Sequence, residues 1–233
     1  RLLLRNNLLG YLSMRLAHRV LLLHEAQRPD IAAAGVPAHR MRVVPQPLPL
    51  AAEEREGEGG IREGLAIGED TRLVLTTMRL DPDKRIDLLR EVMYRVLENP
   101  DAGQCHFVIV GDGAHREWIE EVARAYPSRV HLVGEQPVTR LADYYRAADV
   151  YLHLSKGEGL SNCLVEALFF GVPVIANDSG PITRALISTV TEDPHQIAEA
   201  IIHGGVPVDP VPDMLQPEAN RKAWLEAVEP PSG

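Results

Sequence analysis

The sequence predicts an α/β domain built on a doubly wound, mostly parallel sheet of the Rossmann-like type. From Arg72 onward, short apolar segments alternate with segments whose apolar residues recur at helical spacing. The apolar segments lack the strict polar–apolar alternation of half-exposed strands, which is typical of strands covered by helices on both faces. The chain has 233 residues, 45% of them apolar, so it is long enough to bury such a core.

The elements of this domain follow one another regularly. Each expected strand is a short apolar run, and each expected helix repeats apolar residues every three or four positions. Thr139 is expected to cap one helix, and Gly171 to end another in the left-handed conformation that glycine accepts. The strands are expected at 72–78, 106–111, 130–134, 150–154 and 173–176, and the helices at 86–97, 117–126, 139–148, 162–170 and 194–203.

The segments on either side are less regular. The stretch 51–64 is acidic and rich in glycine, which is typical of a mobile loop or linker. The tail after residue 205 is rich in proline and ends in a helical pattern. Outside the regular domain we expect a helix at 2–16, strands at 19–23 and 41–45, and a helix at 218–228.

Composition narrows the class of protein. A formal charge of −9, from 33 acidic and 24 basic residues, argues against a nucleic-acid-binding protein. The two cysteines, Cys105 and Cys163, lie in apolar stretches without a C-x-x-C pair, so we expect buried thiols rather than a metal site or a disulfide.

The same features favour a cytoplasmic location. No apolar run approaches the roughly 20 residues that cross a bilayer, and the start of the chain lacks the pattern of a signal peptide. Residues 1–18 are rich in leucine and arginine, which is compatible either with a buried helix or with peripheral contact at the inner face of a membrane.

Candidate site residues are those that follow the strands, because parallel α/β sheets bind ligands beyond the carboxyl ends of their strands. Arg79 and Lys84 follow the first strand and precede a helix. Two cations beside a helix N-terminus suit a diphosphate. The alternative is that both are surface charges paired with Asp81 and Asp83.

Gly111 and Gly113 follow the second strand. Glycines at this place permit a tight turn and a close backbone approach to a ligand. An ordinary strand-to-helix turn explains them equally well.

The strongest pattern follows the fourth strand, where Glu158 stands between two glycines and eight positions before Glu166. We expect Glu158 on the loop and Ser161 or Asn162 as the cap of the next helix, whose free N–H groups then face a phosphate. Glu166, one turn inside that helix, is placed to meet ribose hydroxyls. Surface charges, or the paired carboxyls of a glycosidase, are the alternatives. The glycosidase fits less well, because nothing in the sequence indicates a pocket that raises one carboxyl pKa.

Residues 41–202 resemble the C-terminal half of the retaining GT-B glycosyltransferases of family 4, the glycosyl transferases group 1. Blocks in the order and spacing of that family carry the resemblance. They are Val43-Val-Pro-Gln46, Met78-Arg-Leu-Asp-Pro-Asp-Lys84, Val110-Gly-Asp-Gly113, and the Glu158-to-Glu166 signature followed by Ala167, Gly171, Pro173-Val-Ile175 and the Asp178-Ser-Gly180 rim.

The resemblance implies transfer of a hexose-type sugar from a nucleotide diphosphate sugar to a glycan, lipid or small-molecule acceptor. It further implies retention of configuration and no requirement for a metal or cofactor. By matched position, Arg79 and Lys84 would stabilise the leaving diphosphate and Glu158 would contact the donor sugar; these three form the expected catalytic set. The expected donor-binding residues are Gly111, Gly113, Leu160, Ser161, Asn162 and Glu166, with Glu166 on the ribose.

The same resemblance suggests a domain division. Residues 1–50 would be a remnant of an N-terminal, acceptor-binding domain with its connection, 51–205 the donor-binding domain, and 206–233 a proline-rich tail with a C-terminal helix. Met78 departs from the usual glycine of the family. The segment between Gly180 and Pro194 is shorter than usual, which indicates either a trimmed strand or loop residues that this sequence lacks. The alternative functions are a non-catalytic nucleotide-sugar-binding module that acts with a partner chain, and a nucleotide-sugar epimerase of related fold.

Overall fold

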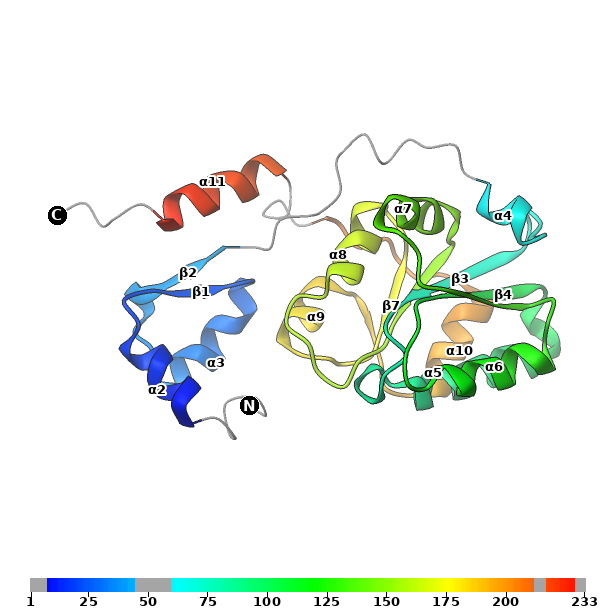
Figure 1. The fold of residues 1–233 in the computed structure, drawn as a ribbon, viewed down its shortest axis with the longest axis horizontal. Coiled ribbons are helices and arrows are strands. Elements are labelled where there is room, and N and C mark those ends of the chain that lie inside the picture. The colour runs from blue at the N-terminus through cyan, green and yellow to red at the C-terminus, as the bar shows by residue number, and fades with distance from the viewer. Residues whose placement is uncertain (1–7, 45–59, 212–216, 229–233) are drawn as a thin grey trace. The chain divides into compact units, whose positions relative to one another are not determined.

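The computed structural model describes residues 8–44, 60–211 and 217–228 (Figure 1). The chain forms two compact units, and each is described by itself. One unit comprises Arg1–Pro49 with Pro212–Gly233, and the other comprises Leu50–Val211.

The larger unit contains a six-stranded, wholly parallel sheet in the order β5-β4-β3-β6-β7-β8. The chain runs outward from β3 to β5 in one direction and from β6 to β8 in the other. The two central strands, β3 and β6, therefore form the switch point at which such sheets bind ligands. The strands are β3 (Arg72–Thr77), β4 (Cys105–Val110), β5 (Val130–Gly134), β6 (Val150–His153), β7 (Val174–Ala176) and β8 (Thr189–Val190).

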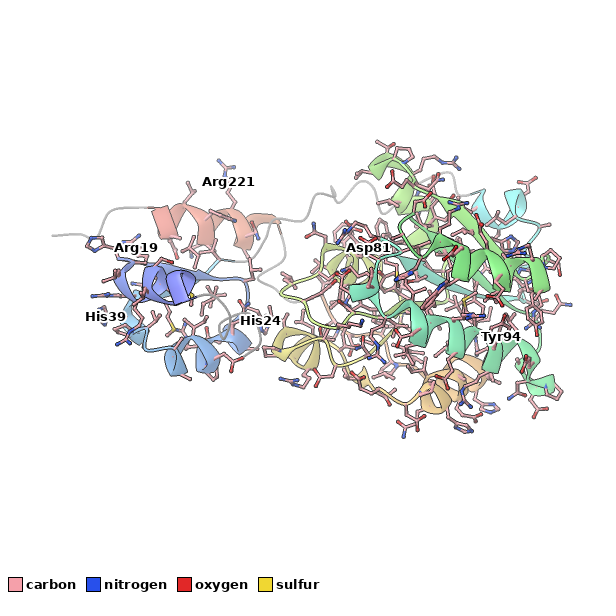
Figure 2. All side chains as sticks on the ribbon, turned by 60° about the horizontal axis from the view of Figure 1, so that its bottom comes forward. Arg19, His24, His39, Asp81, Tyr94 and Arg221 are labelled. Carbon is pink, nitrogen blue, oxygen red and sulfur yellow. The ribbon has the colours of Figure 1, made fainter. Side chains whose placement is uncertain are left out.

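Helices cover both faces of this sheet (Figure 1). One face packs against α5 (Ile86–Glu98), α6 (Arg116–Ala125) and α10 (Pro194–His203). The other packs against α7 (Val138–Ala147) and α8 (Asn162–Phe169), with Ile61 of the short α4 (Ile61–Gly64). Tyr94 of α5, labelled in Figure 2, meets the ring of Tyr126 edge-on at 6.3 Å. The four inner strands β3, β4, β6 and β7 are buried from both sides, as their apolar sequences predict, whereas the edge strands β5 and β8 are partly exposed.

The predicted elements of this unit agree with the structure to within one residue at each end. Gly171 follows α8 with a φ of +68°, which confirms its left-handed conformation. The cap assigned to Thr139 is wrong, because Pro137 supplies the extended entry to α7 and the helix already begins at Val138. The linker expected at 51–64 is wrong over its last four residues, where Ile61 inserts into the core and α4 forms. Residues 51–59 lie outside the described part of the chain.

The segment between Gly180 and Pro194 contains two elements that the sequence pattern did not predict individually. They are α9 (Pro181–Leu186) and the two-residue strand β8, which pairs with β7. The strand at this edge of the sheet is therefore short, in line with the shortened segment.

The smaller unit is built around two parallel strands, β1 (Val20–Leu22) and β2 (Met41–Val43). The same unit also contains the helices α2 (Leu8–Leu16), α3 (Arg28–Ala33) and α11 (Pro217–Val228). Of these three helices, α3 was not predicted. His24 caps a short 3₁₀ turn before α3, and Arg19 donates to the carbonyl of Ala227 in α11 at 2.5 Å (Figure 2). The first six residues of the predicted helix 2–16, and residue 45 of the predicted strand, lie outside the described residues.

Two glycines bring the loops after β3 and β4 into direct backbone contact. A Cβ atom at Gly111 would lie 1.9 Å from the carbonyl oxygen of Met78, and one at Gly113 would lie 2.7 Å from the amide nitrogen of Leu80. The Leu80 amide donates to the Asp112 carbonyl at 2.9 Å, which locks the two loops together. Glycine is required here because the backbone of residues 111–113 lies against the backbone of the neighbouring loop after β3. A role of either glycine toward a ligand remains a prediction.

Replacing Gly111 by Ala should destabilise the domain by about 3 kcal/mol or more, because the added methyl group meets backbone that cannot move aside. Gly171→Ala is the matched control, since Gly171 also has a positive φ but nothing lies within 4 Å of an added Cβ. Its cost should be only that of the left-handed backbone, about 1–2 kcal/mol. Urea unfolding measures both, and equal losses would contradict the proposed contact between the loops.

Candidate functional site

The loop that follows β6 is held from two sides at the carboxyl edge of the sheet. On one side, the Lys156 amide donates to the carbonyl of Asp83, in the loop after β3, at 2.8 Å. On the other side, the Glu158 amide donates to the Ser179 carbonyl, in the loop after β7, at 3.0 Å. Glu158 is thereby placed directly over the switch point between β3 and β6.

Asn177 completes this support from beneath. Its side chain accepts from the Ser155 amide at 2.7 Å and donates to the Ser155 carbonyl at 2.8 Å, and all of these atoms are buried. A buried amide that satisfies both backbone groups of one residue fixes the direction in which the chain leaves β6. The loop carrying Glu158 therefore starts from a rigid point.

The carboxylate of Glu158 lies between two basic side chains. Its Oε1 pairs with Nζ of Lys84, and its Oε2 lies 3.4 Å from Nε2 of His153. The side chains are only 13%, 19% and 7% exposed for Glu158, Lys84 and His153, so solvent screens these charges weakly. Lys84 comes from the short 3₁₀ turn Pro82–Lys84 after β3, and His153 is the last residue of β6. Two of the three predicted catalytic residues thus meet.

Burial and neighbouring charges have opposing effects on the pKa of Glu158. Burial raises its pKa, but the neighbouring His153 and Lys84 outweigh burial and lower the pKa to about 2. Glu158 is therefore an ionised carboxylate at neutral pH. In that form it accepts hydrogen bonds and has no proton to donate.

Sequence reasoning missed His153. A polar residue at the end of a fully buried strand, directly before the loop with the strongest motif, was the signal that could have identified it.

Arg79 lies differently from Lys84. Its side chain is 69% exposed and pairs with Asp81 at 2.5 Å and with Asp83 at 3.9 Å. Asp81 is labelled in Figure 2. The sequence alternative of surface charges paired with these aspartates is thus correct for Arg79 in this structure, whereas Lys84 pairs with Glu158. The structure does not bring Arg79 to the carboxylate.

Glu166 projects from α8 into a buried hydroxyl network. It is 5% exposed and accepts from the Tyr145 hydroxyl at 2.8 Å. Tyr145 also bonds the Thr77 hydroxyl at 2.8 Å, which in turn meets the Tyr151 hydroxyl at 3.0 Å. Burial raises the pKa of Glu166, and the Tyr145 hydrogen bond partly opposes this. The sequence did not indicate a pocket that raises a carboxyl pKa, but the structure has one around Glu166, because α8 directs this side chain into the core one turn after the helix begins.

The start of α8 faces the same edge. Ser161 occupies the N-cap position with extended backbone, but its side chain forms no capping hydrogen bond. Leu160 is buried and Asn162 is exposed. Ser161 is thus the N-cap residue, as predicted, but the capping hydrogen bond expected from its side chain is not formed. Contact of the first-turn amides with phosphate remains a prediction.

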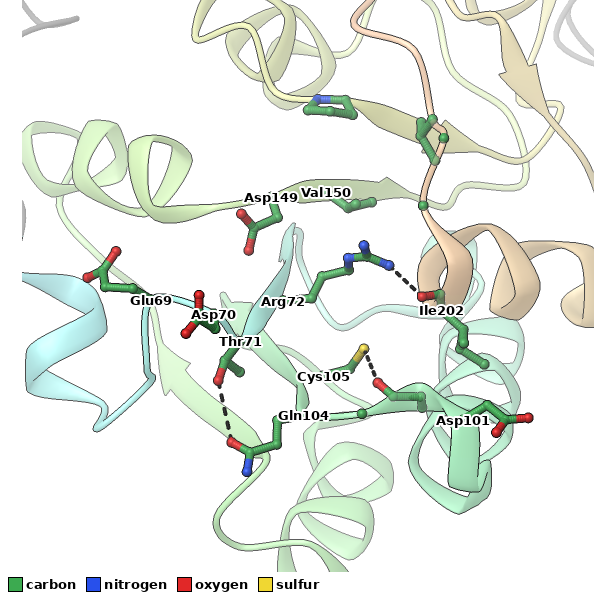
Figure 3. A pocket seen from close by; sticks show the side chains of 16 residues that line it. Glu69, Asp70, Thr71, Arg72, Asp101, Gln104, Cys105, Asp149, Val150 and Ile202 are labelled. Carbon is green, nitrogen blue, oxygen red and sulfur yellow. Dashed lines mark hydrogen bonds between the residues drawn. The ribbon is translucent and has the colours of Figure 1, made fainter.

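A hollow of about 470 Å³ lies at the opposite, amino end of the strands (Figure 3). Arg72 projects into it but donates to the carbonyl of Ile202 at 2.7 Å and to that of Ile201, the last turn of α10. Cys105 donates to the Ala102 carbonyl at 3.0 Å. Arg72, the cation in this hollow, therefore caps the C-terminal end of α10. The hollow also lies away from the carboxyl edge, where parallel sheets bind ligands.

Among residues 8–44, 60–211 and 217–228, no group of three His, Cys, Asp or Glu side chains is arranged to hold a metal ion. Within the same ranges, no helix has the length and apolarity to span a membrane. Cys105 and Cys163 are free thiols.

Comparison with known proteins gives a family match and curated relatives. Residues 71–203 match the family described as glycosyl transferases group 1. The chain is 32% identical over 132 residues to the GDP-mannose-dependent alpha-mannosyltransferase of Mycobacterium tuberculosis, which is 54% of this chain and 32% of the relative. It is 27% identical over 203 residues to the D-inositol 3-phosphate glycosyltransferase of Streptosporangium roseum, which is 83% of this chain and 45% of the relative. The chain thus spans less than half the length of these relatives.

Solved structures share the fold. The sucrose-phosphate synthase of Thermosynechococcus elongatus aligns with a TM-score of 0.69 at 23% identity, over 94% of this chain and 54% of that protein. HepE of Anabaena in complex with UDP aligns with a TM-score of 0.67 at 18% identity, over 92% of this chain and 61% of that protein.

The depressed pKa of Glu158 should appear in the pH dependence of stability. A carboxyl with a folded pKa of about 2, below its ordinary 4.5, stabilises the fold above pH 4.5 and loses that contribution as the pH falls toward 2. Between pH 7 and pH 4, the unaltered protein should lose about 1 kcal/mol more stability than the Glu158→Gln variant. Urea unfolding at both pH values measures this difference. Glu117→Gln, on the exposed side of α6, is the control, and a Glu158→Gln variant that loses as much stability as the unaltered protein would exclude the ion pair.

Proposed function

Because the chain belongs to the glycosyl transferases group 1, we propose that it supplies the donor site of a glycosyltransferase. Its Rossmann-like sheet is that of the GT-B C-terminal domain. In this proposal a nucleotide diphosphate sugar binds at the carboxyl edge of the sheet, and a hexose-type sugar passes to an acceptor with retention of configuration. The observation that carries the proposal is the partly buried Lys84–Glu158 pair over the switch point.

Lys84 and Arg79 take the leaving diphosphate in this mechanism. Negative charge builds up on the diphosphate as the bond to the sugar breaks, and fixed cations in a poorly solvated site stabilise it strongly. Lys84 is already held there by Glu158. Arg79 is exposed and pairs with Asp81 and Asp83, and such exposed pairs cost little to exchange for a phosphate.

Glu158 is the proposed partner of the donor sugar. As a carboxylate with a lowered pKa, it accepts hydrogen bonds from sugar hydroxyls. Its charge also opposes positive charge that develops at the anomeric carbon. The proposal uses no metal or cofactor, since cationic side chains take the place of a metal at the diphosphate.

The nucleoside is assigned to α8 and its preceding loop. Backbone amides of Leu160, Ser161 and Asn162 are proposed to meet the phosphates, helped by the uncapped helix end. Glu166, held by Tyr145, is proposed to accept from the ribose hydroxyls. Gly111 and Gly113 are proposed to border the donor from the neighbouring loop.

One relative is named for GDP-mannose and one neighbour is described with UDP, so the chemistry shared by them is a nucleoside diphosphate. We propose that acceptor recognition, whether of a glycan, a lipid or a small molecule, belongs to another domain of a longer protein. Free thiols at Cys105 and Cys163 favour a cytoplasmic setting, with peripheral contact at a membrane if the acceptor is a lipid.

Calorimetry with UDP, GDP and ADP tests the donor site. One of these nucleotides should bind, and Lys84→Ala and Arg79→Ala should each weaken its binding by roughly 1.5–3 kcal/mol, the range of charge-assisted hydrogen bonds. Lys84→Ala should cost more, since it leaves Glu158 to repel the diphosphate. Arg95→Ala, an exposed cation on α5 paired with Glu91, is the control and should bind normally. Unchanged affinity in both site variants, or no binding of any nucleotide, would overturn the proposal.

A further inference from the structure

His153 faces Glu158 from beneath the site. It lies at the end of β6 with its side chain 7% exposed, and its ring lies nearly parallel to that of Tyr151, two residues earlier, at 6.3 Å. Its Nε2 is 3.4 Å from Oε2 of Glu158. Among the described residues, neither of these two buried atoms has a hydrogen-bond partner of normal geometry. They are therefore available to each other, since a shift of about half an ångström makes a hydrogen bond.

The two oxygens of Glu158 thus have separate neighbours. Oε1 pairs with Lys84, on the loop after β3, and Oε2 faces His153, on β6. If Lys84 turns to a donor diphosphate, Oε1 loses its cation. A carboxylate that is 13% exposed is costly to leave unpaired, so something must hold it at that moment. His153 is the neighbour placed to do so.

We propose that His153 is a positioning residue that holds Glu158 through Oε2 when Lys84 leaves Oε1 for the diphosphate. This inference rests on the proposed donor site. Nε2–H of His153 donates to Oε2, the carboxylate stays over the switch point, and Oε1 becomes free to accept from a hydroxyl of the donor sugar. Lys84 thus moves from the Glu158 carboxylate to the diphosphate. Glu158 is held first by Lys84 and then by His153, so its charge is never left without a partner.

The test is a double-mutant cycle on nucleotide binding. His153→Phe keeps an aromatic ring beside Tyr151 and removes the donor, while His153→Gln offers an amide donor in its place. Each change is made in the unaltered chain and in Glu158→Gln, where no charge needs holding. Calorimetry with whichever of UDP, GDP and ADP binds the unaltered chain measures the dissociation constants, and thermal unfolding checks each variant. His153→Leu replaces the Phe variant if that variant does not fold.

In the unaltered chain, His153→Phe should weaken nucleotide binding roughly 10-fold or more, the effect of losing a hydrogen bond to a charged group. His153→Gln should restore binding to within about threefold. In the Glu158→Gln background, His153→Phe should change binding less than about twofold, because residues that act through one another are not additive. Equal losses in both backgrounds, or no loss in the first, would overturn the positioning role. If the unaltered chain binds none of UDP, GDP and ADP, the proposed function fails first and the inference with it.

Discussion

The contact between Lys84 and Glu158 is the constraint on which the site depends. It joins the loops after β3 and β6, the two central strands from which the chain builds the parallel sheet outward in opposite directions. Neither charge is well solvated, so each needs the other, and the surrounding loops are tied to keep them together. The Lys156 and Glu158 amides bond the loops on either side, and Asn177 fixes the exit of β6. These hydrogen bonds between the loops therefore fix where Lys84 and Glu158 lie, which the side-chain contact between the two residues would not do alone.

A second layer supports this arrangement from inside the domain. Thr77 ends β3, Tyr151 lies in β6, Tyr145 comes from α7 and Glu166 from α8, and their polar groups meet in one buried network. Buried polar groups are costly unless they are satisfied, so the network favours one relative placement of two strands and two helices. It fixes the direction of Glu166 at the same edge as Lys84 and Glu158. Scaffold and candidate site therefore share residues.

Much of the fold was predictable because its signals are local. Apolar strands and helical spacing placed five strands and five helices of the larger unit to within one residue, although α4, α9 and β8 were not predicted. The edge that carries the site followed from the parallel sheet. The misses have equally local causes. Thr139 was a plausible cap until Pro137 set the start of α7, and α4 formed within a glycine-rich stretch because Ile61 found the core.

The site was harder to predict, because its contacts are not local. Lys84 and Glu158 are 74 positions apart, and no pattern in either loop states that they meet. His153 is hidden in a run of strand residues, where a histidine is normally assigned to the core. The close approach made by Gly111 depends on the adjacent loop and appears only when both strands are in place. Strand order, which the sequence leaves open, decides which of these loops are neighbours.

Amide hydrogen exchange with and without a saturating nucleoside diphosphate tests the central claim most directly, because it reports where on the chain the ligand is felt. The account predicts slower exchange in residues 78–85 and 155–164, the two loops at the switch point and the start of α8. It predicts no change in 101–105 and 202–206, around the hollow at the amino edge. Protection at the amino edge without protection at the two loops would contradict it.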